Sequence, residues 1–267
     1  SVSVSTVSRV LNDRPDVSED VRRKVLSAIK NSNYIPNNSA RDLVRTKSDA
    51  VGLVVRGVSN PFYTDIIRAI ERTITDAGFT MVMQQIGTCD DEVKCGAVME
   101  REKRLQGLIF LGGRSDYSPA ELALLNVPFV CCSYSNRYGT LIEGEYSSVS
   151  IADGDTAQQA VEELYRHGHR RIAALISRPD DQSISQLRYE GYVQALESHG
   201  IPVDPELVIS TGGFGAKDAY RAVQEKMAEN VDFTALFAIA DSMAIGAMRA
   251  LMDAGRRIPE DCSVIAI

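Results

Sequence analysis

Ala50-Val51-Gly52-Leu53-Val54-Val55 is a continuous apolar run, and it is too short to form a helix of its own. Such a run is typical of a parallel β-strand that is buried on both faces. Residues 62–77 then carry apolar side chains at helical spacing, and Gly78 ends the predicted helix. The apolar face consists of Ile66, Ile67, Ile70 and Ile74. A buried strand, a loop and a helix in this order predict the first unit of an α/β fold.

The same alternation of strand and helix continues along the rest of the sequence. Further strands are predicted over residues 79–85, 108–111 and 128–132, with helices over 90–104 and 119–125. A second series begins near Ser147, with strands over 148–151, 172–177, 207–210, 235–240 and 263–267 and helices over 156–167, 185–199, 216–229 and 242–254. The alternation predicts parallel sheets with right-handed crossovers, and two series predict two lobes.

A different pattern precedes the first buried strand. Val7, Val10 and Leu11 have helical spacing within a segment rich in Ser and Thr, which predicts a short helix that offers polar side chains to a partner. Residues 13–16 predict a turn, and Ser18 is expected to cap a second helix. The apolar face of that helix is expected to contain Val21, Val25, Leu26 and Ile29. Two short helices around a polar turn favour a helix-turn-helix head, although the first segment alone also fits an ordinary Ser-capped amphipathic helix.

Charge is distributed unevenly along the 267 residues, although the whole chain has a formal charge of −7. Residues 1–48 contain nine Lys and Arg against five Asp and Glu, which is a net charge of +4 and leaves −11 on the remainder. A basic segment on an acidic body is expected where one part of a protein meets phosphate. The charge pattern therefore favours a nucleic-acid partner for the head alone.

Cysteine, histidine and hydropathy patterns exclude several classes of protein. The five cysteines show no Cys-x-x-Cys or Cys/His spacing for zinc, so we expect reduced core thiols and no metal or other cofactor. His167 and His169 lie at the end of a predicted helix, where a role at the helix terminus is favoured over a metal site. No stretch resembles a signal peptide, and no apolar run approaches a membrane span. A cytoplasmic protein without a membrane partner is expected.

Several motifs together resemble a known family. Residues 2–12 read Val-Ser-Val-Ser-Thr-Val-Ser-Arg-Val-Leu-Asn, and Tyr34-Ile35-Pro36-Asn37 and Ala40-Arg41-Asp42-Leu43 follow. This ordered set resembles the head and hinge of the lactose-repressor (LacI/GalR) family of bacterial transcription regulators. The resemblance extends through the body in Val58-Ser59-Asn60-Pro61-Phe62-Tyr63, Gly168-His169-Arg170-Arg171-Ile172, Arg188-x-x-Gly191 and Asp241-x-Met243-Ala244-x-Gly246-Ala247.

The resemblance implies a domain organisation for the whole of this sequence. We expect a partial all-α helix-turn-helix DNA-binding head over residues 1–37 and a hinge helix and linker over 38–49. A two-lobed, periplasmic-binding-protein-like body of parallel sheets follows, with an N-terminal lobe over 50–146 and an incomplete C-terminal lobe over 147–267. Compared with the family pattern, the first head helix and the C-terminal segments are expected to be absent from this sequence. The implied protein is usually dimeric, and apolar surface on the first lobe, including part of the helix over 62–77, is the expected dimer face.

The resemblance also assigns residues to operator DNA. Val4, Ser5 and Arg9 are expected to face base edges, since one Arg can donate two hydrogen bonds to guanine. Leu43 is expected to open a base step from the minor groove once the hinge segment folds on DNA. Asp42 departs from the small polar residue usual there. The residues expected at the DNA interface are Ser3, Val4, Ser5, Thr6, Ser8, Arg9, Asn12, Tyr34, Asn37, Ala40 and Leu43.

A second site is expected in the cleft between the lobes. In open parallel sheets, ligands bind beyond the carboxyl ends of strands, so the loops at residues 56–61, 133–136 and 178–183 and at Asp241 are expected to converge there. The resemblance implies a small effector, most often a sugar, with Arg188 donating to its oxygens and Phe214 stacking on it. The residues expected to contact the effector are Asn60, Phe62, Tyr63, Ser133, Arg188, Phe214 and Asp241.

Three of these residues also have purely structural explanations. Phe62 and Phe214 could belong to the core. Asp241 could cap the helix that follows it. Ala240 stands where the family usually has Asn, which removes one amide contact to the effector.

Three functions compete at this point. The sequence favours a transcriptional repressor whose operator affinity is controlled by an effector. A sugar-binding protein of transport shares the body but should carry an export signal and no head. An enzyme of doubly wound fold is disfavoured, because we find no Gly-x-Gly-x-x-Gly, phosphate loop, nucleophile elbow or metal cluster. Gly212-Gly213-x-Gly215 is the nearest glycine run, and it lacks the rest of a nucleotide fingerprint.

Overall fold

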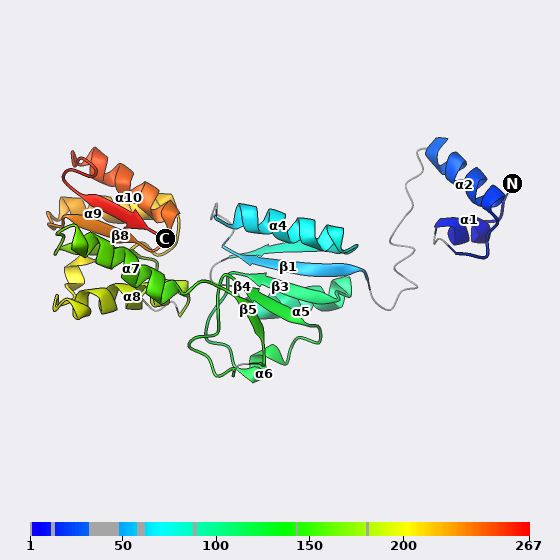
Figure 1. Ribbon diagram of the computed structural model, residues 1–267, viewed down its shortest axis with the longest axis horizontal. Helices are drawn as coiled ribbons and strands as arrows, with labels where there is room; N and C mark the ends of the chain where they lie inside the picture. Colours follow the sequence, from blue (N-terminus) through cyan, green and yellow to red (C-terminus); the bar gives the residue numbers. More distant parts are fainter. Residues whose placement is uncertain are drawn as a thin grey trace. The chain divides into compact units, whose positions relative to one another are not determined.

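The computed structural model describes residues 2–11, 14–31, 48–57, 62–87, 90–142, 144–179 and 182–267. The chain divides into two compact units, Ser1–Thr46 and Lys47–Ile267, which we call the head and the body (Figure 1). Each unit is described by itself. Among the described residues, no helix is long and apolar enough to cross a membrane.

The head contains the two predicted helices, α1 (Val4–Leu11) and α2 (Glu19–Asn31). The Ser3 hydroxyl accepts a hydrogen bond of 3.2 Å from the Thr6 N–H, which satisfies one of the unpaired donors at the start of α1. The two helices contact each other, and Val10 of α1 and Val25 of α2 are each only 4% exposed. Leu26 is 49% exposed, so its predicted place on the buried face of α2 is wrong.

The first lobe of the body is built on one parallel sheet with strand order β2-β1-β3-β4-β5. The predicted central strand, β1 (Ala50–Arg56), pairs with β2 (Thr80–Ile86) on one side and β3 (Gly107–Leu111) on the other. Helix α4 (Phe62–Asp76) packs on one face of this sheet, and α5 (Glu92–Lys103) packs on the opposite face (Figure 1). The continuous apolar run is thus buried from both sides, as its composition predicted.

The outer part of this sheet corrects the predicted lobe boundary. Strand β4 (Phe129–Cys132) pairs with β3, and β5 (Ser147–Val149) then pairs with β4. The prediction that this last strand begins the second lobe is therefore wrong. Because β5 is short and fully exposed, its sequence carries no burial pattern that would assign it to either sheet. A four-residue helix, α6 (Pro119–Leu122), lies in the connection from β3 to β4.

The second lobe has a parallel sheet with strand order β7-β6-β8-β9. Its strands are β6 (Ile172–Ile176), β7 (Val208–Ser210), β8 (Ala235–Ala238) and β9 (Ser263–Ala266). Helices α7 (Asp153–Arg166) and α8 (Ile184–Ser198) pack together, as do α9 (Ala216–Ala228) and α10 (Asp241–Asp253) (Figure 1). A short 3-10 helix, Pro205–Leu207, precedes β7. The two predicted series of strands and helices are confirmed apart from β5.

Two glycines allow the helix pairs of the second lobe to approach closely. A Cβ atom at Gly191 in α8 would collide with the backbone oxygen of Gly154 in α7. A Cβ atom at Gly246 in α10 would likewise collide with the backbone oxygen of Ala216 in α9. A backbone atom cannot move away as the end of a flexible side chain can. These glycines therefore set the spacing of each helix pair.

We predict that Gly246→Ala lowers the free energy of unfolding by about 1–3 kcal/mol, because an overpacked contact forces the backbones apart. Urea unfolding followed by circular dichroism would measure this change in the free energy of unfolding. Ile245→Ala is the matched control, since Ile245 is 64% exposed in the same helix and should change stability little. Equal stability of Gly246→Ala and the parent protein would show that the helices have room to separate.

The cysteines and histidines occupy structural positions. Cys131 and Cys262 are buried thiols, and Cys95 and Cys132 are half-buried; the fifth, Cys89, lies outside the described residues. His167 is the C-cap residue of α7, as predicted. His169 instead contacts Thr234 and Ser263 through its two ring nitrogens, at 2.9 Å and 3.1 Å. Within the described ranges, no cluster of His, Cys, Asp or Glu has the arrangement of a metal site.

Candidate functional site: an effector pocket and a DNA-binding head

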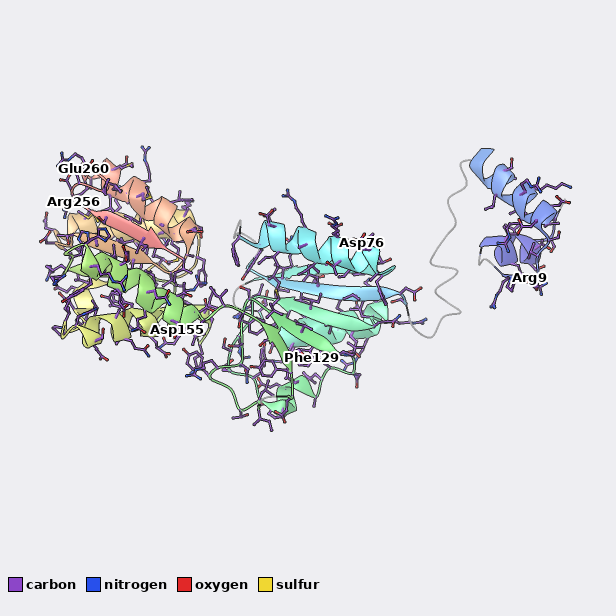
Figure 2. All side chains as sticks on the ribbon, in the orientation of Figure 1. Arg9, Asp76, Phe129, Asp155, Arg256 and Glu260 are labelled. Carbon is purple, nitrogen blue, oxygen red and sulfur yellow. The ribbon has the colours of Figure 1, made fainter. Side chains whose placement is uncertain are left out.

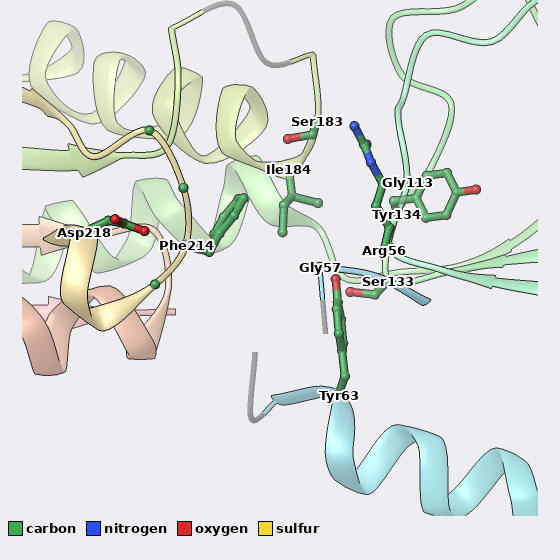
Figure 3. Close-up of a pocket in the computed structure, with 14 residues that line it drawn as sticks. Arg56, Gly57, Tyr63, Gly113, Ser133, Tyr134, Ser183, Ile184, Phe214 and Asp218 are labelled. Carbon is green, nitrogen blue, oxygen red and sulfur yellow. The ribbon is translucent and has the colours of Figure 1, made fainter. Parts of the chain in front are cut away.

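A cavity of about 320 Å³ lies in the body and takes lining residues from both lobes (Figure 3). This volume is at the lower end of the range of small-molecule pockets. The first lobe contributes Arg56, Gly57, Tyr63, Gly112, Gly113, Ser133 and Tyr134. The second lobe contributes Ser183, Ile184, Gly212, Gly213, Phe214, Gly215 and Asp218.

The parallel topology places these residues in the pocket. Arg56 is the last residue of β1, Gly112 follows β3, and Ser133 follows β4. Residues 212–215 come shortly after β7. The carboxyl ends of parallel strands meet at one edge of a sheet, and both lobes present this edge to the cavity. The predicted convergence of the loops is thus confirmed for those after β1, β4 and β6.

Two residues with positive φ shape the first-lobe side of the pocket. Ser133 has a φ of +66°, which is uncommon for a residue with a side chain, and its N–H donates to the Val149 carbonyl at 2.8 Å. Gly112 has a φ of +71°, and a Cβ atom there would collide with the Tyr63 hydroxyl. The sharp turns after β3 and β4 therefore let the Ser133 hydroxyl and the Tyr63 phenol reach the cavity.

Tyr63 is the main aromatic group on the first-lobe side. It lies in the first turn of α4, is 8% exposed, and projects toward the cavity (Figure 3). Burial raises the pKa of its phenol, although Arg188 and Arg56 act in the opposite direction. The hydroxyl therefore stays protonated at neutral pH and can both donate and accept a hydrogen bond.

On the second-lobe side, a glycine-rich loop holds Phe214. The Ser242 hydroxyl donates to the Phe214 carbonyl at 2.6 Å, and the Thr211 hydroxyl donates to the Gly213 carbonyl. These bonds fix a loop that the three glycines would otherwise leave free to move. The half-buried Phe214 ring borders the cavity, and Asp218 stands in the first turn of α9 (Figure 3).

The head offers a polar surface on α1. Ser3 and Ser5 are exposed, and their hydroxyls are 2.7 Å apart. Arg9 projects from the same helix and forms an exposed ion pair of 3.4 Å with Asp16 (Figure 2). Such an exposed pair contributes little to stability, so Arg9 can exchange Asp16 for another acceptor at small cost. Thr6 is half-buried, and Val4 and Ser8 lie in the same helix.

The sequence matches two family models, which cover the two units separately. "Bacterial regulatory proteins, lacI family" matches residues 1–37, and "Periplasmic binding proteins and sugar binding domain of LacI family" matches residues 48–266. The chain belongs to the LacI family.

Curated relatives and solved structures agree with this assignment. The regulator MalR of Clostridium butyricum is 39% identical over 99% of this chain and 78% of its own length. The complex of the regulator CelR with cellobiose has a TM-score of 0.69 and 32% identity, covering 99% of this chain and 79% of CelR. The lac repressor dimer bound to operator and anti-inducer has a TM-score of 0.79 and 27% identity, covering 99% of this chain and 78% of the repressor chain. This LacI-family protein is a DNA-binding transcriptional regulator with a periplasmic-binding-protein-like body.

Within this LacI-family body, three of the seven expected effector residues line the pocket: Tyr63, Ser133 and Phe214. Phe62 is adjacent to Tyr63 but is 56% exposed and absent from the lining. Asp241 is exposed at the first position of α10, where Ala240 is the N-cap residue, so Asp241 neither lines the pocket nor caps the helix. Asn60 lies outside the described residues, as do Asn12, Tyr34, Asn37, Ala40 and Leu43, which were expected at the DNA interface.

Arg188 has a different environment from the one expected. It is buried and does not line the cavity. Its guanidinium forms an ion pair with Asp153 at 2.7 Å and also donates to the Ile239 carbonyl. Nε adds a second bond to Asp153 at 2.8 Å. In this structure Arg188 therefore joins α7, α8 and the end of β8 behind the pocket.

Several lining residues were not predicted individually. Arg56 and Ser183 lie in loops for which the strand pattern predicts only a range of residues. Gly212, Gly213 and Gly215 fit no nucleotide fingerprint in the sequence, and in the structure they border the cavity on either side of the predicted Phe214. Asp218 lies inside a predicted helix, so nothing in the sequence separated it from the other charged residues on the surface. Tyr134 follows Ser133 directly, and its side-chain direction depends on the unusual backbone at that position.

Proposed function

We propose that this regulator responds to an uncharged sugar, which binds in the pocket and changes the affinity of the head for operator DNA. The observation that carries the proposal is the composition of the pocket. Arg56 and Asp218 supply one positive and one negative group, Ser133 and Ser183 supply hydroxyls, and Tyr63 and Phe214 supply aromatic rings. Sugar hydroxyls both donate and accept hydrogen bonds, and the apolar face of a sugar ring packs against an aromatic ring. The solved complex of CelR with cellobiose supports a disaccharide of this class.

The proposed mechanism needs two states of the body. A sugar shifts the balance between them only by the difference between its affinities for the two states. Because the pocket takes residues from both lobes, a bound sugar favours the arrangement in which both sides contact it. We infer that this arrangement changes how the heads of a dimer are presented to the operator.

Calorimetric titration of the protein with cellobiose, maltose and other neutral disaccharides would test the proposal. Binding of at least one of them, together with a change in operator affinity when that sugar is added, is expected. Binding that leaves operator affinity unchanged would favour a sugar-binding protein without a regulatory role. Failure of all the neutral sugars to bind would overturn the proposed effector class.

We infer that the regulator acts on DNA as a homodimer through the first lobe. The surface of this lobe presents the apolar side chains Phe79 at 36% exposure and Met83 at 42% exposure, and Met83 lies on the edge strand β2. Helix α4 lies against the same strand. Analytical ultracentrifugation should find a stable dimer, and a monomer at micromolar concentration would contradict this inference.

Arg9→Ala is expected to relax base preference at one position of the operator and to weaken binding of the preferred sequence. The expected loss is about 1–3 kcal/mol, the usual contribution of a bidentate contact between Arg and guanine. Fluorescence anisotropy with operators substituted at single positions would measure the loss at a fixed salt concentration. Arg23→Ala on α2 is the control, because this residue is also exposed and pairs with Asp20. Equal loss on every operator would mean that Arg9 contacts only phosphate.

A further inference from the structure

The two lobes of the body contact each other where the loop after β3 meets the start of α8. The Ser115 N–H in this loop donates a hydrogen bond of 3.0 Å to the Gln182 carbonyl of the second lobe. Ile184 lies in the first turn of α8, lines the cavity, and packs against the apolar core of the first lobe (Figure 3). We call the bond between Ser115 and Gln182 and the contact of Ile184 with the first-lobe core the latch. The latch joins the lobes through protein groups alone.

The first lobe holds its side of the latch in place. The Ser115 carbonyl accepts hydrogen bonds from the N–H groups of Tyr138 and Gly139 in the loop after β4, at 2.7 Å and 3.1 Å. The Asn136 side chain of this second loop accepts from the Tyr117 N–H and donates to the Tyr117 carbonyl, at 2.7 Å and 2.9 Å. The loops after β3 and β4 therefore form one support that presents the Ser115 N–H to the second lobe.

The second lobe anchors its side of the latch at the N-terminus of α8. Ser183 is the N-cap residue, and its hydroxyl accepts a hydrogen bond of 3.3 Å from the Ser185 N–H. The Ser185 hydroxyl in turn accepts a hydrogen bond of 3.3 Å from the N–H of Ser177, the residue that follows β6. Because α8 also packs along α7, a movement of the second lobe carries Gln182 and Ile184 with it. A movement that separates the lobes here therefore breaks the latch.

The latch is a small contact, and its size decides what it can do. Two lobes move relative to each other unless their interface is large and apolar. One backbone hydrogen bond and one half-buried aliphatic side chain favour this arrangement of the lobes without fixing it. Ile184 contacts the first-lobe core and also lines the cavity. A ligand that fills the cavity beside Ile184 therefore favours the same arrangement as the latch.

We propose that the latch holds a fraction of the sugar-free protein in the arrangement that binds sugar, and that it thereby sets operator affinity before sugar arrives. Only this fraction is competent to bind, so the latch also raises the apparent affinity for sugar. Breaking the latch should shift the sugar-free protein away from this arrangement, and a covalent bond in its place should hold every molecule in it. This inference rests on the proposed function, because it takes sugar binding and operator binding to be coupled through the arrangement of the lobes.

A disulfide across the latch is the first test. Ser115→Cys combined with Gln182→Cys places two thiols at residues whose backbones are joined by a hydrogen bond, and neither residue lines the cavity. The Ser115 hydroxyl has no hydrogen-bond partner within the described residues, so the cysteine removes no bond there. In the oxidised double variant, operator affinity without sugar should match that of the sugar-saturated parent protein. Added sugar should then change this affinity less than about twofold, because the arrangement of the lobes is held.

Reduction of the disulfide should restore the response of the parent protein to sugar. Fluorescence anisotropy with labelled operator DNA would measure the affinities, and peptide mass spectrometry would confirm the bond. Ser115→Cys and Gln182→Cys alone, treated with the same oxidant, are the matched controls, because neither can bridge the lobes.

Ile184→Ala tests the same inference in the opposite direction. It should shift sugar-free operator affinity about three- to tenfold away from the value of the sugar-saturated parent protein, because fewer molecules hold the sugar-binding arrangement. The affinity is measured without sugar, since Ile184 also lines the cavity. Ile245→Ala is the control, because Ile245 is 64% exposed in the same lobe and should leave operator affinity unchanged. A merely structural role of Ile184 would lower the unfolding midpoint without changing the operator affinity.

Failure of this inference and failure of the proposed function give different results. An oxidised double variant that keeps the full response of the parent protein to sugar would overturn the latch and retain the proposed function. A disulfide that does not form in the folded double variant would also overturn the latch. If no neutral sugar binds the parent protein, opposite shifts of operator affinity in the oxidised double variant and in Ile184→Ala would retain the latch and overturn the sugar effector.

Discussion

Replacing Arg188 with alanine is expected to lower the free energy of unfolding of the body by about 3–5 kcal/mol. The side chains of Arg188 and Asp153 are 8% and 4% exposed, and their ion pair is 2.7 Å long. Removing the arginine leaves the Asp153 carboxylate buried without its cation, and it also removes the donor to the Ile239 carbonyl. Urea unfolding would measure the loss, which is a large fraction of the stability of an ordinary domain.

Two comparisons identify the cause of that loss. Replacing both partners, in Arg188→Met with Asp153→Leu, should lower the free energy of unfolding less than Arg188→Ala alone, because no unpaired charge remains.

The loss of stability in Arg188→Ala should also shrink as the pH falls towards about 4, the ordinary pKa of an aspartate. Burial already raises the pKa of Asp153, and the positive charge of Arg188 opposes that effect. The pKa of Asp153 should therefore be higher still in the variant that lacks Arg188. An acid with a raised pKa in the folded state is destabilising at high pH, and protonation at low pH relieves the cost. A deficit independent of pH would point to lost packing instead.

Phe214→Ala is expected to weaken sugar binding roughly thirtyfold, or by about 2 kcal/mol, while operator binding without sugar is retained. The ring borders the cavity from a loop that is fixed by the Ser242 hydroxyl, so it is in place before a ligand arrives. Calorimetry would give the affinity for whichever sugar the parent protein binds. Fluorescence anisotropy with labelled operator DNA would give the operator affinity without sugar.

Phe62→Ala is the matched control for this substitution. Phe62 was also expected to contact the effector, but its side chain is 56% exposed and does not line the cavity. The two variants remove the same ring, so the difference between their affinities reports the position of the ring. If Phe62→Ala weakens sugar binding as strongly as Phe214→Ala, the pocket assignment is wrong on the first-lobe side.

Much of the fold could be predicted from the sequence, because burial on two faces leaves a strong pattern. The run at residues 50–55 and the fully buried β6 are continuous apolar segments, and each of these two strands is followed by a helix. The errors occurred where burial is weak. Strand β5 is exposed throughout, and Leu26 is an apolar residue on an exposed surface of the head. Apolar composition alone does not show which face of a short helix is covered.

The pocket was predictable as a region and less so as a set of residues. The parallel topology brings together the loops at the carboxyl ends of strands, so it predicts the region of the cavity. The individual residues Tyr63, Ser133 and Phe214 were implied by the resemblance to the LacI family. The location of Arg188 depends on a long-range partner, since Asp153 lies 35 positions earlier in the chain. Arg56 ends a buried strand, and nothing in the sequence distinguishes it from any other charged residue at the end of a strand.

The glycines behind Tyr63 and Glu92 have a consequence for the design of biosensors from this regulator. Gly112 and Gly113 lie against the Tyr63 hydroxyl and the Glu92 carboxylate, so a larger residue at either position would displace the wall rather than reshape the cavity. Ser183 and Phe214 face the cavity from the opposite lobe, where a new side chain changes the ligand surface directly. A library for altered sugar recognition should therefore randomise the second-lobe positions and leave the two glycines unchanged.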